Sequence, residues 1–322
     1  RRMNGLLIRA AGPRSLIQDR GRFGHHGLGI TTGGPLDWIA LDWANRLLDN
    51  PADAAAVEIT LGPLELEAMI PTTLAVTGPA TLRINNRTRP AWQCHVVMPG
   101  DRIAVGVKPA GLCAYLALAG GVQSRPMLGS RATVTREGLG GLHGRDTRPL
   151  QTGDFLPVDP DIGTPIRSLA RHFQPDYGQA ATLRMLPGFQ WRQFGRAARR
   201  HLADARFTVS PQSSRMGLRL TGPPIPSPEG AKTSEGVCAG AIQITPDGQP
   251  IVLLADRQTI GGYPKPGAVI TADLPRLGQL RPGAMLQFQP VTPATARAAL
   301  AQIFQRFEAG ERSWRHDAPQ TR

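Results

Sequence analysis

The sequence predicts a mainly β protein with a few helices, arranged as two domains. Its 322 residues include 37 glycines and 30 prolines, which separate many short apolar runs. That pattern is typical of β-sandwiches and β-barrels. The length suggests two domains, because roughly 150 residues make one. Three similar turn-and-strand units, which begin at Pro99, Thr152 and Pro282, are compatible with two related β-domains.

Short apolar runs bounded by turn residues predict the buried strands. The expected strands are residues 73–77, 81–84, 96–98, 102–107, 114–119, 155–158, 181–186, 242–245, 251–254, 269–272 and 285–289. Residues 159–180 have mixed polarity with scattered prolines and glycines, which is typical of a connection. We therefore expect domains at residues 5–165 and 180–291, followed by a C-terminal helix and polar tail at residues 292–322.

Three helices are expected among the strands. The first begins near Pro35, since proline suits the first turn of a helix, and ends at Asn50–Pro51. Its apolar side chains fall on one face: Leu36, Ala40, Trp43, Ala44 and Leu47. The second is expected at about residues 191–203 and the third at about residues 293–310. The polar residues after Gly310, which end in RSWRHDAPQTR, are expected to be disordered.

The formal net charge of +13 raises the question of an anionic partner. Nucleic acids and anionic membrane surfaces attract such proteins. The arginines are scattered, however, and no aromatic platform accompanies their clearest cluster. That cluster has the spacing of one helix face: Arg192, Arg196, Arg199 and Arg200. A solvated helix face is the favoured interpretation, so no nucleic acid and no membrane are predicted as partners. A small anionic substrate stays open.

The cysteines and the apolar runs indicate the compartment. Cys94, Cys113 and Cys238 are far apart and odd in number, and they match neither a zinc site nor a disulfide framework. No apolar run reaches the roughly 18 residues of a membrane span. The basic N-terminal stretch is broken at Gly12–Pro13, too early for a signal peptide. A cytoplasmic location is expected.

Standard cofactor motifs do not occur. No P-loop pattern is present, and the glycine-rich residues 138–145 miss the dinucleotide pattern because His143 takes the place of its last glycine. His25 and His26 are adjacent, so on a strand they would point to opposite faces, and no metal site is expected. An ATP site would need other geometry or a partner protein.

The most informative stretch runs from Ser234 to Lys265. The apolar run at residues 251–254 predicts a buried strand, after which polar residues and two glycines follow at once. These residues are Asp256, Arg257, Gln258, Gly261, Gly262, Tyr263 and Lys265. Polar groups on a loop held by a rigid strand favour a binding or catalytic site. A solvated turn after an edge strand is the alternative.

Other candidate groups lie outside that stretch. Asp19 stands beside the cations Arg20 and Arg22, and Glu58 lies on an expected strand, where it could serve as a base. A local Asp19–Arg22 ion pair and a strand-end acid are the structural alternatives. Arg215 is a candidate clamp, because a guanidinium binds carboxylate or phosphate with two parallel hydrogen bonds.

The motifs together resemble the allophanate hydrolase subunit 2 family. The resemblance covers about residues 5–291 and follows the family's order. Its segments are residues 17–22, 33–37, 44–47, 50–51, 58–62, 128–131, 186–188, 209–211, 214–220 and 234–265. It implies two cyclophilin-like β-barrel domains with a cleft between them. It further implies that the motif residues face that cleft.

The family includes a component of 5-oxoprolinase. The resemblance implies ATP-dependent hydrolysis of 5-oxo-L-proline to L-glutamate, with A-type and B-type partner proteins, and a chain that is inactive alone. The expected catalytic residues are the acids Asp19, Glu58, Glu235 and Asp256. The expected substrate-binding residues are Gln18, Arg22, Arg215, Arg257, Gln258, Tyr263 and Lys265.

Two other functions stay open under the same resemblance. One is the carboxyltransferase component of a biotin-dependent carboxylase of the urea carboxylase type, with biotin on a separate carrier. The other is a regulatory protein that binds a kinase-inhibitor-like partner. The chain also departs from the family's motifs: Arg20 replaces an apolar residue, and Ser214 replaces the asparagine before Arg215. The loss of that amide bears on the choice of substrate.

Overall fold

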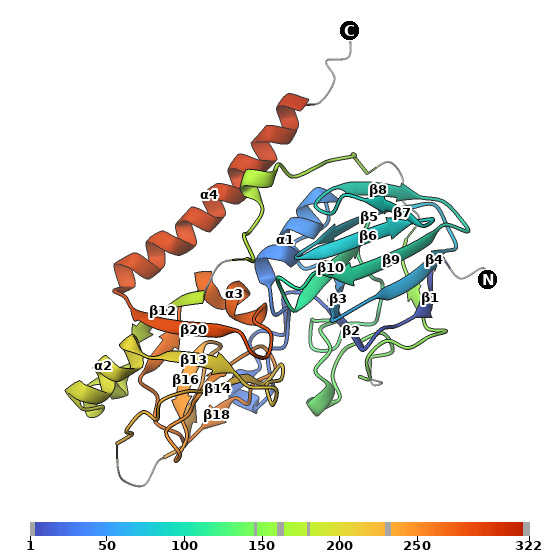
Figure 1. Cartoon of the computed structure of the whole chain (residues 1–322). Coiled ribbons are helices and arrows are strands. Elements are labelled where there is room, and N and C mark those ends of the chain that lie inside the picture. Colours follow the sequence, from blue (N-terminus) through green and yellow to red (C-terminus); the bar gives the residue numbers. More distant parts are fainter. Residues whose placement is uncertain (1–3, 145–146, 160–163, 179–180, 229–232, 318–322) are drawn as a thin grey trace. The chain divides into compact units, whose positions relative to one another are not determined.

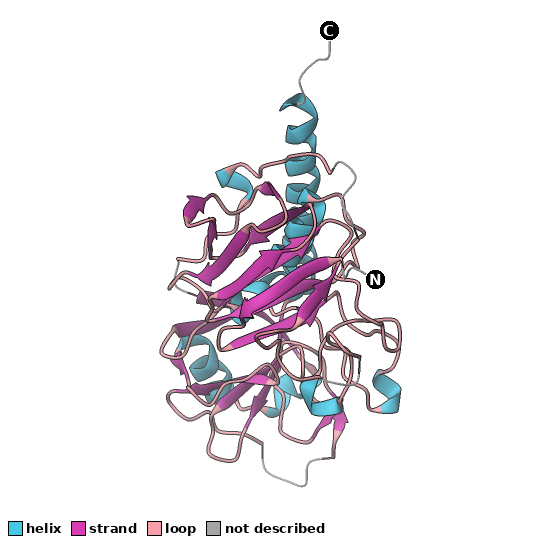
Figure 2. Cartoon of the chain, turned by 90° about the vertical axis from the view of Figure 1, so that its right-hand side faces the viewer, coloured by secondary structure: helices cyan, strands magenta, loops and turns pink. Residues whose placement is uncertain are grey.

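The computed structural model describes residues 4–144, 147–159, 164–178, 181–228 and 233–317 (Figure 1). The described part contains four α-helices. Strands predominate over helices (Figure 2), which confirms a mainly β protein. Contacts divide the chain into two compact units. Unit 1 consists of residues 1–22, 33–177 and 304–322, and unit 2 of residues 23–32 and 178–303. The sequence instead assigned residues 5–165 to one domain and residues 292–322 to a separate tail.

Unit 1 contains two antiparallel sheets that share one core. The six-stranded sheet has the order β11-β1-β4-β9-β6-β7. Its strands are β1 (Gly5–Ala10), β4 (Leu64–Ala68), β6 (Ala80–Ile84), β7 (Arg87–Arg89), β9 (Arg102–Val107) and β11 (Phe155–Pro157). The five-stranded sheet has the order β2-β3-β10-β5-β8. Its strands are β2 (Arg14–Gln18), β3 (Ala56–Thr60), β5 (Thr72–Thr77), β8 (Cys94–Val97) and β10 (Cys113–Leu118). Buried side chains of both sheets form a single apolar cluster.

Helix α1 (Trp38–Leu47) lies against β5 and β10 of the five-stranded sheet (Figure 1). Asp37 caps its first turn, because the Asp37 carboxylate accepts a hydrogen bond from the Ala40 amide at 3.0 Å. The predicted apolar face is confirmed for Ala40, Trp43, Ala44 and Leu47, which are fully buried. Leu36 is buried as well, but it precedes the helix, which begins three residues after Pro35. Strand β10 is therefore buried on both faces, by the shared core on one side and α1 on the other.

Unit 2 is built on a closed barrel of seven strands in the order β12-β19-β16-β17-β14-β13-β20. These are β12 (Ala181–Pro187), β13 (Arg206–Val209), β14 (Gly217–Thr221), β16 (Ala241–Ile244), β17 (Pro250–Leu253), β19 (Gly267–Val269) and β20 (Met285–Pro290). A separate two-stranded ribbon pairs β15 (Glu235–Gly236) with β18 (Ile260–Gly261). Unit 2 also contains helices α2 (Arg196–Asp204) and α3 (Leu274–Gly278) and the first part of α4 (Pro293–Asp317).

Most predicted strands overlap observed ones, but the prediction for residues 269–272 is largely wrong. β19 ends at Val269, and a 3₁₀ turn, Thr271–Asp273, follows it. The second predicted helix is also divided, into a 3₁₀ turn (Phe189–Gln193) and α2. Phe194 between them is buried, and the chain there is extended rather than helical.

The expectation of a disordered tail after Gly310 is wrong for the described residues. Helix α4 (Pro293–Asp317) runs on through Gly310. A Cβ at Gly310 would come within 2.4 Å of the Trp43 ring, so the helix passes this point in direct contact with that ring. Beyond it, Trp314 Nε1 donates to the Ser168 carbonyl at 2.8 Å. These contacts stabilise a segment whose composition is polar.

The arginine cluster was expected to be a solvated helix face, and neither a membrane span nor a metal site was expected. In the arginine cluster, Arg192, Arg196 and Arg200 are exposed, and the Arg199 guanidinium lies 5.7 Å from the centre of the Trp191 ring. No helix among the described residues has the length and apolar character needed to cross a membrane. The same residues contain no group of three or more histidine, cysteine or acidic side chains arranged to hold a metal ion.

Candidate functional site

Asp19 joins two loops of unit 1. Its side chain is buried, and one carboxylate oxygen accepts hydrogen bonds from the Ser130 hydroxyl at 2.6 Å and the Gly21 amide at 2.9 Å. The other oxygen accepts from the Arg131 amide. Three hydrogen bonds therefore hold this carboxylate in place between residues 21 and 130–131. These contacts give Asp19 a structural role, and its predicted catalytic role stays a prediction.

Arg22 reaches the same segment from the other end of the motif. Its side chain is 1% exposed, and it donates from Nε to the Met127 carbonyl at 3.0 Å and from Nη2 to the Ala132 carbonyl at 2.9 Å. Gln18, the last residue of β2, donates to the Thr133 carbonyl at 3.1 Å. The motif at residues 18–22 therefore binds residues 127–133, more than 100 positions further along the chain. The Gln18 Oε1 atom is buried and has no hydrogen-bond partner among the described residues.

Glu58 belongs to a buried polar cluster under the start of α1. Glu58 on β3 and Tyr115 on β10 are directly opposite in register, and the Tyr115 hydroxyl donates to Glu58 at 2.7 Å. The Leu36 amide also donates to Glu58, at 2.8 Å, and the Asp37 amide donates to the Tyr115 hydroxyl at 2.8 Å. Tyr177 donates to the Asp37 carboxylate at 3.0 Å. Neither tyrosine was predicted, because Tyr115 is a single aromatic residue on an apolar strand and Tyr177 lies in an irregular segment with no pattern.

The environment of Tyr115 predicts a pH dependence of stability. Burial raises the pKa of Tyr115 well above 10.0, and the nearby Cys113, Glu58 and Asp37 add to the rise. The unfolded chain loses the phenolic proton near pH 10 while the folded chain keeps it, so the free energy of unfolding falls as the pH rises above about 10. Tyr177, also with a raised pKa caused mainly by burial, acts in the same direction.

Urea unfolding between about pH 8 and about pH 11 measures this effect. The decline should become shallower in Tyr115→Phe, while Tyr263→Phe, at a 42% exposed ring, serves as the control. A Tyr115→Phe variant whose stability follows the wild-type pH curve would contradict the assignment.

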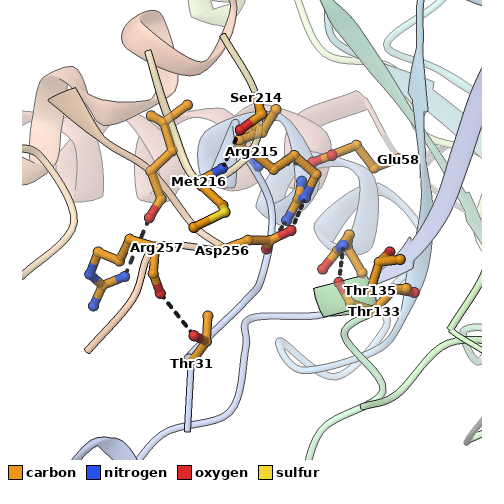
Figure 3. A network of polar contacts seen from close by, with 12 residues as sticks. Thr31, Glu58, Thr133, Thr135, Ser214, Arg215, Met216, Asp256 and Arg257 are labelled. Atoms are coloured by element: carbon orange, nitrogen blue, oxygen red, sulfur yellow. Dashed lines mark hydrogen bonds and ion pairs between the residues drawn. The ribbon is translucent and has the colours of Figure 1, made fainter. Parts of the chain in front are cut away.

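Arg215 and Asp256 form a buried ion pair in unit 2. Arg215 donates from Nε and Nη2 to the two oxygens of Asp256, both at 2.9 Å, in the parallel arrangement visible in Figure 3. The two side chains are 4% and 7% exposed. The Asp256 amide also donates to the Arg215 carbonyl at 2.9 Å. The predicted clamp therefore holds an acid of its own chain, and this fixes the turn after β17.

The remaining residues of that turn differ in exposure. Arg257 is buried, donates from Nε to the Val237 carbonyl at 3.3 Å, and accepts at its own carbonyl from the Thr31 hydroxyl at 2.8 Å (Figure 3). Burial lowers the pKa of the Arg257 guanidinium, and the nearby Cys238 opposes that shift. Gln258 is partly exposed and Tyr263 is 42% exposed, so these two side chains can meet a solute.

Lys265, Glu235 and Gln190 meet beside the β15–β18 ribbon, and with the ribbon they form what we call the ribbon site. Lys265 Nζ lies 2.6 Å from Glu235 Oε1, and the Gln190 amide donates to the same oxygen at 2.6 Å. The Lys265 backbone amide donates to Gln190 Oε1 at 2.7 Å. The side chains of Lys265 and Glu235 are 14% and 48% exposed. Glu235 is open to water, whereas the Lys265 Nζ atom is buried beneath it, so the ion pair has one solvated partner.

Gln190 was not among the predicted residues. It lies in the 3₁₀ turn after β12, next to Phe189, which is fully exposed. Neither residue belongs to a periodic pattern, so no signal along the chain marks them. The described structure thus brings Glu235 and Lys265 together and adds Gln190, whereas Arg215 and Asp256 pair separately.

A cavity of about 750 Å³ lies within unit 1, and none of the predicted site residues lines it. The Arg20 side chain, between Asp19 and Gly21 in the sequence, pairs there with Asp42 at 2.8 Å. Burial raises the pKa of Asp42, and Arg20 opposes that rise. Each of the three arginines at the cavity has an acidic partner: Arg20 with Asp42, Arg46 with Glu311, and Arg167 with Asp49.

Known proteins resemble this chain over most of its length. It is 36% identical to the C subunit of 5-oxoprolinase from Escherichia coli (strain K12) over 287 residues, which are 88% of this chain and 90% of the relative. It is 32% identical to the corresponding 5-oxoprolinase protein of Haemophilus influenzae, over 87% of this chain and 89% of the relative. It is 31% identical to a putative urea carboxylase of Emericella nidulans, over 87% of this chain but 24% of the relative.

Solved structures agree in fold. The crystal structure of TTHA0988 superposes with a TM-score of 0.80 at 34% identity, over 89% of this chain and 56% of that chain. The K. lactis urea amidolyase superposes with a TM-score of 0.87 at 26% identity, over 94% of this chain and 20% of that chain. This chain thus spans about half of one structure and a fifth of the other.

The family model described as the carboxyltransferase domain, subdomain A and B, matches residues 28–290. The chain therefore belongs to this carboxyltransferase domain family.

Proposed function

We propose that this chain is the C component of an ATP-dependent 5-oxoprolinase complex, which hydrolyses 5-oxo-L-proline to L-glutamate. The observation that carries the proposal is the likeness to the C subunits of two 5-oxoprolinases, over 90% and 89% of their lengths. The urea carboxylase relative is matched over 24% of its length. Because the two relatives are named as C subunits, we infer that subunits A and B exist, and we place the chain in a hetero-oligomer with A-type and B-type partners.

The chemistry requires an activated lactam and groups that hold its charge. ATP, as co-substrate, would phosphorylate the lactam oxygen and leave as ADP. Water would then add to the ring carbon, and the carbon–nitrogen bond would break to give γ-glutamyl phosphate. A second water would hydrolyse this acyl phosphate to L-glutamate and free phosphate. The ammonium of Lys265 is suited to bind the substrate carboxylate or a phosphate oxygen, because a fixed cation stabilises charge that develops during reaction. The chain has no P-loop, so we assign the ATP-binding groups to the assembled complex and expect no turnover by the isolated chain.

Among the four acids, Glu235 is the best placed general base. Asp256 pairs with Arg215, Asp19 accepts three hydrogen bonds, and Glu58 is fully buried. Glu235 is 48% exposed and lies at hydrogen-bonding distance from the Lys265 ammonium. A base must reach a proton of water or substrate, which favours the accessible carboxylate.

A cytoplasmic location fits this function. Cys94, Cys113 and Cys238 all lie in the described part of the chain, and none forms a disulfide. Thiols that stay reduced favour a reducing compartment.

A second candidate is the carboxyltransferase component of a biotin-dependent carboxylase. The likeness to the putative urea carboxylase and to the urea amidolyase structure supports it. In that case the complex would include a carrier with a biotinylated lysine, and the chain would act on the carboxylated biotin.

Glutamate release from 5-oxo-L-proline and ATP, measured with co-expressed A-type and B-type partners, tests the two candidates. ATP-dependent glutamate that requires all three chains would support the 5-oxoprolinase assignment. A well-folded, complete complex that releases no glutamate would contradict it. Transfer of the carboxyl group from a carrier with carboxylated biotin to urea, catalysed by the chain, would establish the second candidate instead.

A further inference from the structure

Gln243 is a buried amide whose donor has no partner. It lies on β16, its side chain is 2% exposed, and its Nε2 atom has no hydrogen-bond partner among the described residues. Nearly all buried polar groups in folded proteins are hydrogen-bonded, so each exception calls for an explanation. An unpaired amide also destabilises the fold, because it has lost its bonds to water.

The environment of Gln243 places the amide under the ribbon. Its neighbours along β16, Ile242 and Ile244, are fully buried, and side chains alternate along a strand, so Gln243 points to the opposite face. That face is covered by β18: a Cβ at Gly261 would lie 2.5 Å from Gln243 Nε2. The lack of a side chain at Gly261 is what leaves room for the amide.

The same geometry brings Gln243 to the ribbon site. Gly261 is the register partner of Glu235 across the ribbon. On the other side, Ile242 pairs with Gly267 and the Ile244 amide donates to the Pro264 carbonyl at 2.9 Å, so Lys265 passes beside Gln243. An amide donor, an ammonium and a carboxylate therefore share one small region.

We propose that Gln243 positions the substrate by donating a hydrogen bond from Nε2 to the carbonyl oxygen of a small amide bound at the ribbon site. The proposal rests on the proposed function, in which that carbonyl is the lactam of 5-oxo-L-proline. Lys265 then pairs with the anionic group of the ligand, and Glu235 accepts its N–H. The carbonyl oxygen of the bound substrate would then be the hydrogen-bond acceptor that Gln243 Nε2 lacks within the protein.

This arrangement determines specificity. 5-Oxo-L-proline and L-proline share a carboxylate. They differ at the ring carbonyl that Gln243 would bind and at the nitrogen, which is a neutral amide in the lactam and an ammonium in L-proline. A site whose buried donor needs an acceptor discriminates strongly against an analogue without one, because the donor stays unpaired in that complex. Gln243 would therefore favour the lactam, whereas Lys265 would bind the carboxylate of either compound.

The test compares Gln243→Met with the wild type in the assembled complex. Methionine has a similar shape and no donor, so we expect the melting temperature of the variant to be equal or higher. Calorimetric titration should show 5-oxo-L-proline binding weakened by at least tenfold, with the weak binding of L-proline unchanged. In turnover, the loss should appear mainly in KM.

Gln249→Met is the matched control. Gln249 is a glutamine of the same unit whose amide is satisfied, since it accepts from the Gly222 amide at 2.9 Å and donates to the Gly222 carbonyl at 3.1 Å. Its loss should lower the melting temperature and leave binding unchanged. Gly261→Ala is a second probe, because its new methyl group displaces the Gln243 amide, and it should weaken binding of the lactam.

Three results would overturn the proposal. One is a Gln243→Met variant with a lowered melting temperature and unchanged lactam binding; another is equal loss of affinity for the lactam and L-proline. The third is a wild-type complex that binds no 5-oxo-L-proline. Binding is measured separately from glutamate release, so a complex that binds the lactam without opening it contradicts the proposed function and leaves the role of Gln243 intact.

Discussion

Lys265→Met should lower kcat/KM of the assembled complex for 5-oxo-L-proline by about 10²- to 10³-fold, the range seen when one charge-stabilising group is removed from an active site. The ammonium lies 2.6 Å from Glu235 and is the cation of the ribbon site. The fold should persist, because the partner Glu235 is 48% exposed and a pair of this kind contributes about 1 kcal/mol or less. Steady-state kinetics and urea unfolding measure the two quantities.

Lys108→Met provides the control for this substitution, since Lys108 is an exposed lysine of unit 1. It should leave both kcat/KM and stability unchanged. If Lys265→Met retained wild-type kinetics in a complete complex, the ribbon site would not be the place where the substrate's charge is bound.

Arg215→Met should reduce the free energy of unfolding by about 3–5 kcal/mol, because it leaves the Asp256 carboxylate buried without its partner. Asp256→Asn should have an effect in the same direction. The double replacement of both side chains by methionine should cost less than the sum of the two single changes, since a buried pair can often be exchanged for apolar groups at little cost. Urea unfolding of the full chain measures all of these variants.

Arg312→Met is the comparison for the buried pair. Arg312 lies 3.9 Å from Glu308, and the two side chains are 66% and 67% exposed, so its loss should cost about 0.5 kcal/mol or less. A cost below about 1 kcal/mol for Arg215→Met would contradict the structural role. The result also matters for function: lost activity in an unstable Arg215 variant cannot identify Arg215 as a substrate clamp.

Local patterns predicted much of the fold. The face of α1 follows from the spacing of Ala40, Trp43, Ala44 and Leu47, and the strand β17 from an apolar run between turns. The continuation of α4 could not be predicted in this way. It depends on packing of the helix against Trp43 and on the Trp314–Ser168 hydrogen bond, which join residues far apart in the sequence.

Only part of the candidate site was predicted, because local patterns mark single segments and not contacts between distant ones. Glu235 and Lys265 stand out as polar residues around a buried strand, and the structure pairs them. Gln190 is 45 residues before Glu235 in the chain, and Tyr115 contacts Glu58 from the neighbouring strand, 57 residues away. The fold brings these residues together, and the spacing of residues within one segment does not predict such contacts. The unpaired state of Gln243 likewise becomes visible only when Gly261 is placed above it.

The way the chain alternates between the two units has a consequence for biosynthesis. Trp43, made early, packs edge-to-face on Phe307, with ring centres 4.8 Å apart, and Phe307 is made only after unit 2. During translation the ribosome therefore releases the sheets of unit 1 with the outer face of α1 still uncovered, while all of unit 2 is being synthesised. A nascent chain stalled before Phe304 should expose that tryptophan to chaperones and proteases. Unit 1 can therefore complete its fold only after helix α4 has been synthesised, more than a hundred residues after its last strand.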